Sequence, residues 1–288
     1  MEHAQWKMIE AIVRRLALPR PCDRYRFSDS DIALAALWAC YHEKPMAWVA
    51  RRSSWPVYHR RALPSASTLC RRMRTAPVLR LLEAIRSELE QAGPPGLVHI
   101  IDGKILRVAK HSIDTQATRG GPDGRERGYR LDSIVNPEGL RLVWAVNPLG
   151  VDERVVARDL LVRSGVQGYM LGDSNYHSDP LCRIGADQDL QMVAPRKKEG
   201  RGLGHHPISK ARRRCLAMME FSPTGFSRDL FRVRRQIETM HAHLGGFGGG
   251  LIGLPSWVRG LDRVRRWILA KLVLDAARRA WKRRRRAG

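Results

Sequence analysis

Two aspartates stand directly after apolar segments that are typical of buried strands. Asp102 follows residues 98–101 (Val-His-Ile-Ile), and Asp173 follows residues 169–172 (Tyr-Met-Leu-Gly). A buried carboxylate without a partner is costly, so each of them needs a hydrogen-bonding group or a metal ion. Ligands also collect at strand ends in α/β sheets. The pair therefore indicates a ligand site, although Asp173 could equally cap the segment that follows it.

A third carboxylate, Glu238, belongs to a segment with helical periodicity that we expect to form one long helix over about residues 227–244. Its apolar stripe comprises Leu230, Val233, Ile237, Met240 and Leu244. Phe231, Arg234 and Glu238 share a neighbouring face because they are spaced by three and four residues. Glu238 is thus predicted at the edge of the buried face, pointing toward the strand ends. The alternative is an exposed i, i+4 ion pair between Arg234 and Glu238.

The elements that must position these carboxylates are predicted between residues 97 and 248. Pro94-Pro95-Gly96 marks a boundary with the preceding segment. The pattern then predicts β, hairpin, α, β, α, β, α: strands at 97–103, 129–135, 140–146, 169–173 and 191–194, and helices at 152–164, 179–187 and 227–244. His241 and His243 are expected to be surface histidines of the last helix.

Residues 1–96 are predicted to be helical. Apolar periodicity and capping signals indicate several helices, of which a short one carries Arg71, Arg72 and Arg74. Such a helix suits a helix-turn-helix domain that places basic side chains against DNA. An ordinary helical bundle with solvated arginines explains the pattern equally well.

The charge balance of the chain points to a polyanionic partner. Its 288 residues include 52 Lys and Arg against 28 Asp and Glu, which gives a formal net charge of +24. Nucleic acid is the first partner to consider, and an anionic membrane surface is the second. Residues 249–288 form a basic C-terminal helical segment with 12 basic and 2 acidic side chains. We expect its arginine-rich end to be a solvated, frayed tail.

The protein is predicted to be cytoplasmic and without a membrane-spanning segment. No apolar run reaches the length of a transmembrane helix, and the N-terminus lacks the pattern of a signal peptide. The five cysteines show no CxxC pair and are widely spaced, which is typical of a reducing compartment.

The pattern around the three carboxylates resembles the DDE transposases of bacterial insertion sequences. The matching motifs are Ile-Asp102-Gly-Lys, Leu-Gly-Asp173-Ser-Asn-Tyr176, and Arg234-x-x-x-Glu238 on a late helix. The resemblance covers about residues 97–260. It implies an α/β, RNase H-like catalytic core, a mixed sheet flanked by helices, preceded by a helical N-terminal domain. It further implies a nucleoid-associated protein that acts as a homodimer on the terminal inverted repeats of its element and on target DNA.

The resemblance assigns the catalytic metal ions, two Mg²⁺ or Mn²⁺, to Asp102, Asp173 and Glu238. Carboxylate oxygens suit hard divalent ions and leave room for water and phosphate. The helix signature of that family, Tyr-x-x-Arg-x-x-x-Glu with a Lys seven residues on, departs here at Phe231 and at Gly245. The missing Lys leaves its phosphate contact to another group.

Other residues are predicted to contact DNA. Arg234 can hold a phosphate through its guanidinium fork. Two aromatic residues near the carboxylates complete the set, Tyr176 shortly after Asp173 and Phe231 on the face of Glu238. The basic run Arg196-Lys197-Lys198 joins them because it lies between the last predicted strand and the helix of Glu238. Two other functions stay open: a transposase-derived DNA-binding protein without catalytic activity, and a related nuclease that cleaves without joining.

Overall fold

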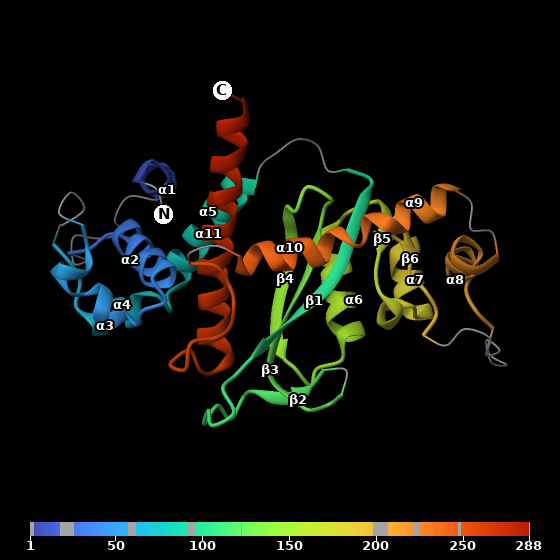
Figure 1. Ribbon diagram of the computed structural model, residues 1–288, viewed down its shortest axis with the longest axis horizontal. Helices are drawn as coiled ribbons and strands as arrows, with labels where there is room; N and C mark the ends of the chain where they lie inside the picture. Colours follow the sequence, from blue (N-terminus) through green and yellow to red (C-terminus); the bar gives the residue numbers. More distant parts are fainter. Residues whose placement is uncertain are drawn as a thin grey trace. The chain divides into compact units, whose positions relative to one another are not determined.

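The computed structural model describes residues 3–17, 26–56, 62–90, 96–121, 123–197, 207–221, 225–246 and 249–287 (Figure 1). The chain forms two compact units. Unit 1 comprises Met1–Ala92 and His243–Gly288, and unit 2 comprises Gly93–Ala242. The sequence analysis treats the basic C-terminal segment as a region of its own, whereas the structure joins it to the N-terminal helices in one unit.

Unit 2 is built on a mixed sheet of six strands. β1 (Val98–Arg107), β3 (Glu126–Val135) and β4 (Arg141–Pro148) run antiparallel, and β2 (Thr118–Gly120) pairs with the start of β3. β5 (Gly168–Leu171) lies parallel to β1, and β6 (Leu190–Val193) lies parallel to β5. The strand order β4-β3-β1-β5-β6 is the arrangement of an RNase H-like core, so the predicted fold class is confirmed. β2 lies in a segment that the sequence pattern did not predict as a strand.

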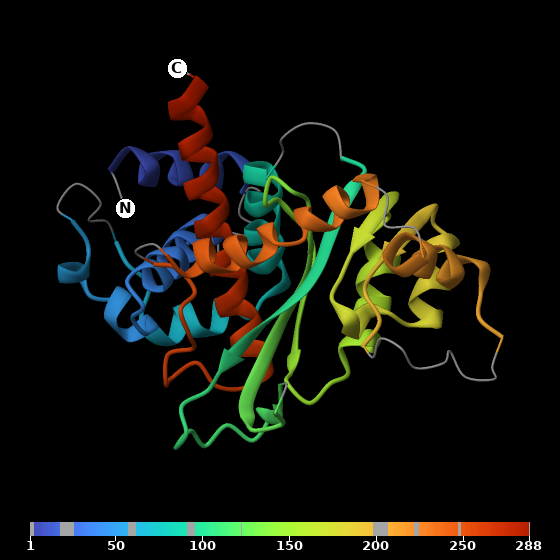
Figure 2. The same ribbon diagram turned by 45° about the vertical axis from the view of Figure 1, so that its right-hand side comes forward.

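Helices cover both faces of this sheet (Figures 1 and 2). α6 (Glu153–Ser164), α7 (Asp179–Ala186) and α8 (Lys210–Leu216) pack against the face that carries Ile101 and Ile134. α9 (Gly225–Val233) and the first part of α10 (Gln236–Gly245) pack against the face that carries Ile100 and Val135. Because neighbouring residues of a strand point to opposite faces, β1 contributes to both cores.

The predicted long helix over residues 227–244 is wrong as a single element. It is divided at Arg234 and Arg235, whose amides donate to the carbonyls of Phe231 and Arg232 at 3.1 Å each. These bonds span three residues and tighten the chain locally, which interrupts the α-helical ladder. The apolar stripe survives the break, because Leu230 and Ile237 are buried against the sheet and Val233 and Met240 pack beside them.

Unit 1 is helical. It contains α1 (His3–Leu16), α2 (Asp29–Tyr41), α3 (Met46–Val49), the 3₁₀ turn η1 (Arg52–Ser54), α4 (Ala66–Arg72), α5 (Ala76–Glu90) and α11 (Leu261–Ala287). α2 begins with a capping box in which Ser28 and Asp31 satisfy each other's backbone amides. It is buried on nearly all sides, since α1, α4, α5 and α11 all pack against it.

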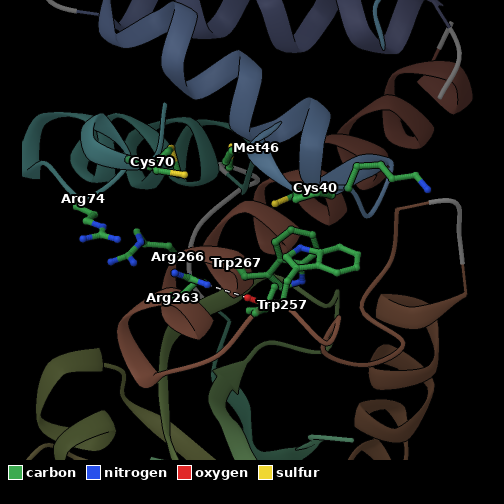
Figure 3. A pocket seen from close by; sticks show the side chains of 12 residues that line it. Cys40, Met46, Cys70, Arg74, Trp257, Arg263, Arg266 and Trp267 are labelled. Atoms are coloured by element: carbon green, nitrogen blue, oxygen red, sulfur yellow. Dashed lines mark hydrogen bonds between the residues drawn. The ribbon is translucent and has the colours of Figure 1, made fainter. Parts of the chain in front are cut away.

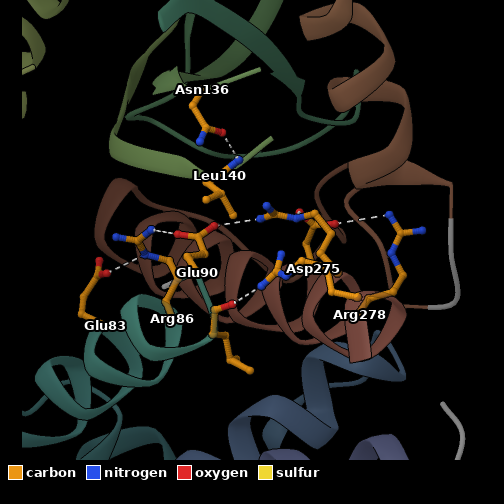
Figure 4. Close-up of polar contacts among 10 residues, drawn as sticks. Glu83, Arg86, Glu90, Asn136, Leu140, Asp275 and Arg278 are labelled. Carbon is orange, nitrogen blue, oxygen red and sulfur yellow. Dashed lines mark hydrogen bonds and ion pairs between the residues drawn. The ribbon is translucent and has the colours of Figure 1, made fainter. Parts of the chain in front are cut away.

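The C-terminal helix α11 differs from the expected frayed tail. It continues to Ala287 and packs against α5 and α2. Figure 4 shows the ion pairs that fix it: Glu90 of α5 binds both Arg86 and Arg279, and Arg279 also binds Asp275 at 3.1 Å. Part of the basic terminal sequence therefore holds the helices together.

Candidate active site at the sheet edge

Asp102 lies in the middle of β1 and not at a strand end as expected, because β1 continues to Arg107 along β3, whereas Asp173 lies two residues beyond the end of β5. The two aspartates are nevertheless neighbours across the sheet. The register of β1 and β5 pairs His99 with Met170 and Ile100 with Leu171, and two positions further along are Asp102 and Asp173. Alternation along the strands places both residues on the face covered by α9 and α10. Asp173 Oδ1 also accepts the Asn175 amide at 2.8 Å, so this aspartate caps the short 3₁₀ turn η3 (Ser174–Tyr176).

Two further carboxylates, Asp132 and Glu153, stand close to this edge. Asp132 of β3 accepts a hydrogen bond from Arg130 Nε at 2.6 Å, and Glu153, the first residue of α6, lies 3.4 Å from the same guanidinium. Burial raises the pKa of Asp132 to about 6. The pKa of Glu153 is raised mainly by burial, and further by Asp173 and Asp102.

Neither residue was predicted from the sequence as part of a site. Asp132 lies inside the predicted strand at 129–135, where a buried carboxylate needs a partner. Glu153 stands in the first turn of the predicted helix at 152–164, directly after the capping Asp152. A carboxylate there is commonly explained by the helix dipole alone, so it carried no functional meaning by itself.

His241 faces Asp102, contrary to the expectation of a surface histidine. Its Nε2 lies 3.3 Å from Asp102 Oδ2, and its side chain is only 12% exposed. Burial lowers the pKa of His241, and the neighbouring Asp102 opposes this shift. On β1, Lys104 follows Asp102 on the same face and its Nζ lies 3.5 Å from the His241 carbonyl oxygen. The Asp102 carboxylate thus faces an imidazole, and an ammonium group lies on the same face of β1.

Glu238 is exposed and lines a groove of about 500 Å³ along α9 and α10. Phe231 and Arg234 line the same groove, as their predicted common face requires, together with Arg228, Arg232 and Arg235. Among the residues that the structure describes, no group of three or more His, Cys, Asp or Glu side chains is gathered to hold one metal ion. The structure therefore unites Asp102 with Asp173 but does not place Glu238 against them.

The basic loop after β6 lies at the same sheet edge. Lys197 Nζ is 3.5 Å from Asn175 Oδ1, and Asn175 in turn donates to Glu153 at 3.0 Å. Arg196 is half-buried directly before it. Lys198 lies outside the described residues. Lys197 is thus linked through Asn175 to the carboxylate of Glu153.

Tyr176 is a core residue and not an accessible DNA contact. It is 1% exposed and packs with the α6 and α7 side of the sheet. A Cβ at Gly172 would lie 2.9 Å from the Tyr176 Cβ, so only glycine lets the chain pass the ring here. Burial raises the pKa of the Tyr176 hydroxyl well above its usual value.

The three arginines of α4 and its end have different environments. Arg72 is buried, binds Asp29 at 2.5 Å and donates to the Phe27 carbonyl oxygen at 3.1 Å. It is therefore a structural residue of unit 1, which corrects its assignment as a DNA contact. Arg71 and Arg74 are exposed.

The chain's sequence matches no protein-family model and no curated protein. Among solved structures, it is similar to a piggyBac transposase in a synaptic complex with hairpin DNA, determined by cryo-electron microscopy. The TM-score is 0.49 and the identity is 9%, over 97% of this chain and 72% of that chain. A likeness of this degree does not by itself indicate a shared activity. Among the described helices, none combines the length and apolar character needed to cross a membrane.

Proposed function

We propose that the edge formed by Asp102 and Asp173 is the catalytic centre of a DDE-type transposase that cleaves DNA at element ends and joins the ends to target DNA. The observation that carries this proposal is the parallel register of β1 and β5, which brings two acids 71 positions apart in the sequence to neighbouring positions on one face of the sheet. The net charge of +24 supports a polyanionic substrate.

The donor set suits Mg²⁺ or Mn²⁺, because Asp102 and Asp173 offer carboxylate oxygens and hard divalent ions prefer such ligands. Bound divalent ions supply activation of water or of a 3′-hydroxyl, and stabilisation of the leaving oxygen at phosphorus. We assign Glu238 as the third ligand. His241 contacts Asp102, and residues three apart on a helix are surface neighbours, so Glu238 lies one turn from the aspartate edge.

The remaining residues of the site bind and orient DNA. Arg234 and the other arginines of the α9–α10 groove provide guanidinium forks for phosphates. Lys197 lies beside Asn175 and Lys104 lies beside the His241 carbonyl group, so both can offer ammonium groups to DNA near the aspartates, and Lys104 supplies a cation that the missing Lys at position 245 does not. Arg130 holds Asp132 and Glu153, which fixes the strand edge from the opposite face.

A non-catalytic DNA-binding protein is the second candidate. The observation that favours it is that the residue of α10 that lies beside Asp102 is His241 and not a third carboxylate. In that case the arginine groove would bind DNA, and the aspartates would have structural roles. Asp173 would cap η3, and Asp102 would pair with His241.

The test is a cleavage assay on plasmid DNA that carries the inverted repeats flanking the element, with Mg²⁺ or Mn²⁺. We expect the wild-type protein to cut the ends and join them to target DNA, acting as a dimer that bridges two ends. Asp102→Asn and Asp173→Asn should lose activity by several orders of magnitude yet keep DNA binding. Asp159→Asn is the matched control, since Asp159 is exposed on α6 and forms a surface ion pair with Arg163.

The products separate the alternatives. Cleavage without joined products would identify a nuclease. Specific binding without cleavage under either metal would identify the non-catalytic protein and overturn the proposal.

A further inference from the structure

Unit 1 contains a cavity that the proposed catalytic function does not use. It measures about 220 Å³ and lies between the end of α2, the end of α4 and the start of α11. Tryptophan and methionine side chains form much of its wall, including Trp257, Trp267 and Met46. A cavity of roughly 150 Å³ is sufficient for benzene, so this cavity can take one larger aromatic ring system.

Three arginines gather at one side of the cavity, and the two tryptophans lie at the other (Figure 3). These are Arg74, Arg263 and Arg266. Within the described part of the chain, none of them has a carboxylate at ion-pair distance, although Asp262 acts on Arg266 from further away. Burial lowers the pKa of Arg266, and Arg74 and Arg263 add to the effect by like-charge repulsion.

Such a cluster of like charges is unfavourable unless an anion neutralises it. Arg263 is held in place by a hydrogen bond of 2.9 Å to the Trp257 carbonyl oxygen, so the cluster and the aromatic wall are connected. Trp257 itself remains 38% exposed, which is unusual for a large apolar side chain. The site thus presents the exposed ring of Trp257 next to three guanidinium groups.

We propose that this cavity binds a single nucleotide, with the base against Trp257 and the phosphate on Arg266, Arg74 and Arg263. Aromatic faces stack with any base, and guanidinium forks match phosphate geometry. The nucleotide could be a free mononucleotide or an unstacked nucleotide at a DNA end. The inference is independent of the carboxylate edge, so Asp102→Asn should leave binding at this cavity unchanged.

The experiment measures binding of dAMP, deoxyadenosine and inorganic phosphate to the full chain by calorimetry. We expect dAMP to bind at least about tenfold more tightly than either part alone, because stacking and phosphate contacts both contribute. Trp257→Ala and Arg266→Ala should each weaken dAMP binding by about tenfold, and Trp257→Phe should retain most of it. Arg80→Ala is the matched control, since Arg80 is an exposed arginine of α5 outside the cavity.

A competition between a blunt duplex and the same duplex with a short single-stranded overhang identifies the source of the nucleotide. A preference for the overhang that Trp257→Ala abolishes supports a nucleotide of DNA. Tight dAMP binding without that preference supports a free nucleotide. The proposal is overturned if neither dAMP nor the overhang binds preferentially, if phosphate alone binds as well as dAMP, or if Trp257→Ala and Trp257→Phe, with unchanged melting temperatures, bind as the wild type does.

Discussion

At the scale of single residues, the site separates groups for chemistry from groups for binding on one helical segment. Glu238 and Arg234 line the same groove, but a carboxylate near phosphate is repulsive unless a cation lies between them, whereas a guanidinium attracts phosphate directly. The two residues should therefore affect different measurements.

We expect Glu238→Gln to bind DNA about as well as the wild type and to fail in metal-dependent cleavage. Arg234→Ala should bind more weakly, with a shallower salt dependence, because one phosphate contact is lost. Filter binding at several salt concentrations and the cleavage assay measure the two effects. A Glu238→Gln protein that still cleaves in Mg²⁺ would show that the third ligand is misassigned.

Asp132 should give unit 2 a distinctive pH dependence of stability. Its pKa is raised from 3.8 to about 6 by burial, so the folded state disfavours the charged form. The stabilisation from the neutral carboxyl is complete below about pH 4 and is lost as the pH rises through 6. Asp132→Asn should remove this loss of stability between pH 4 and 6, which amounts to about 3 kcal/mol of the free energy of unfolding at most.

Urea unfolding of both proteins at several pH values between 4 and 7 measures the difference. Asp159→Asn changes an exposed carboxylate of the same unit and serves as the control. Parallel stability curves for wild type and Asp132→Asn would contradict the prediction.

At the scale of elements, neighbouring arginines of α4 have opposite roles. Arg72 is buried against Asp29 and the Phe27 carbonyl group, while Arg71 is exposed. Helical spacing explains the difference, since consecutive residues differ by about 100° in direction and only one of them can face the core.

Arg72→Ala should lower the free energy of unfolding of unit 1 by about 3 kcal/mol, because Asp29 loses its partner in a largely buried place. Arg71→Ala should change it by less than about 0.5 kcal/mol and should weaken DNA binding at low salt instead. Thermal unfolding together with binding at two salt concentrations distinguishes the roles. Equal stability of the two variants would refute the structural role of Arg72.

At the scale of the whole molecule, the basic surplus serves two purposes. Some arginines are used inside the fold, such as Arg86 and Arg279 around Glu90 or Arg130 at the sheet edge. Others, such as Arg284 and Arg286 at the end of α11, are exposed. The net charge of +24 is therefore not a measure of the DNA-binding surface alone.

Deleting residues 261–288 should prevent unit 1 from folding, because α11 buries side chains such as Ile268 and Leu272 against the other helices. Deleting only residues 284–288 should leave the melting temperature nearly unchanged and reduce DNA affinity at low salt. Circular dichroism and salt-dependent binding test both deletions. Normal folding without residues 261–288 would show that α11 is dispensable.

The sequence by itself determined the main strands of unit 2 and the position of each aspartate directly after an apolar strand segment. Alternation and apolar periodicity are local properties, and the hairpin at residues 136–139 and the strands at β5 and β6 follow from them directly. The register of β1 and β5, which makes Asp102 and Asp173 neighbours, came from the structure.

Only the tertiary structure decided which polar groups meet at that edge. His241 contacts Asp102 because α10 starts anew after the break at Arg234 and Arg235, and a break in a helix changes the direction of every side chain after it. Glu153 and Asp132 come together through Arg130, across elements whose contact no local pattern encodes. Burial, which turns Arg72 and Tyr176 into structural residues, likewise depends on the packing of segments distant in the sequence.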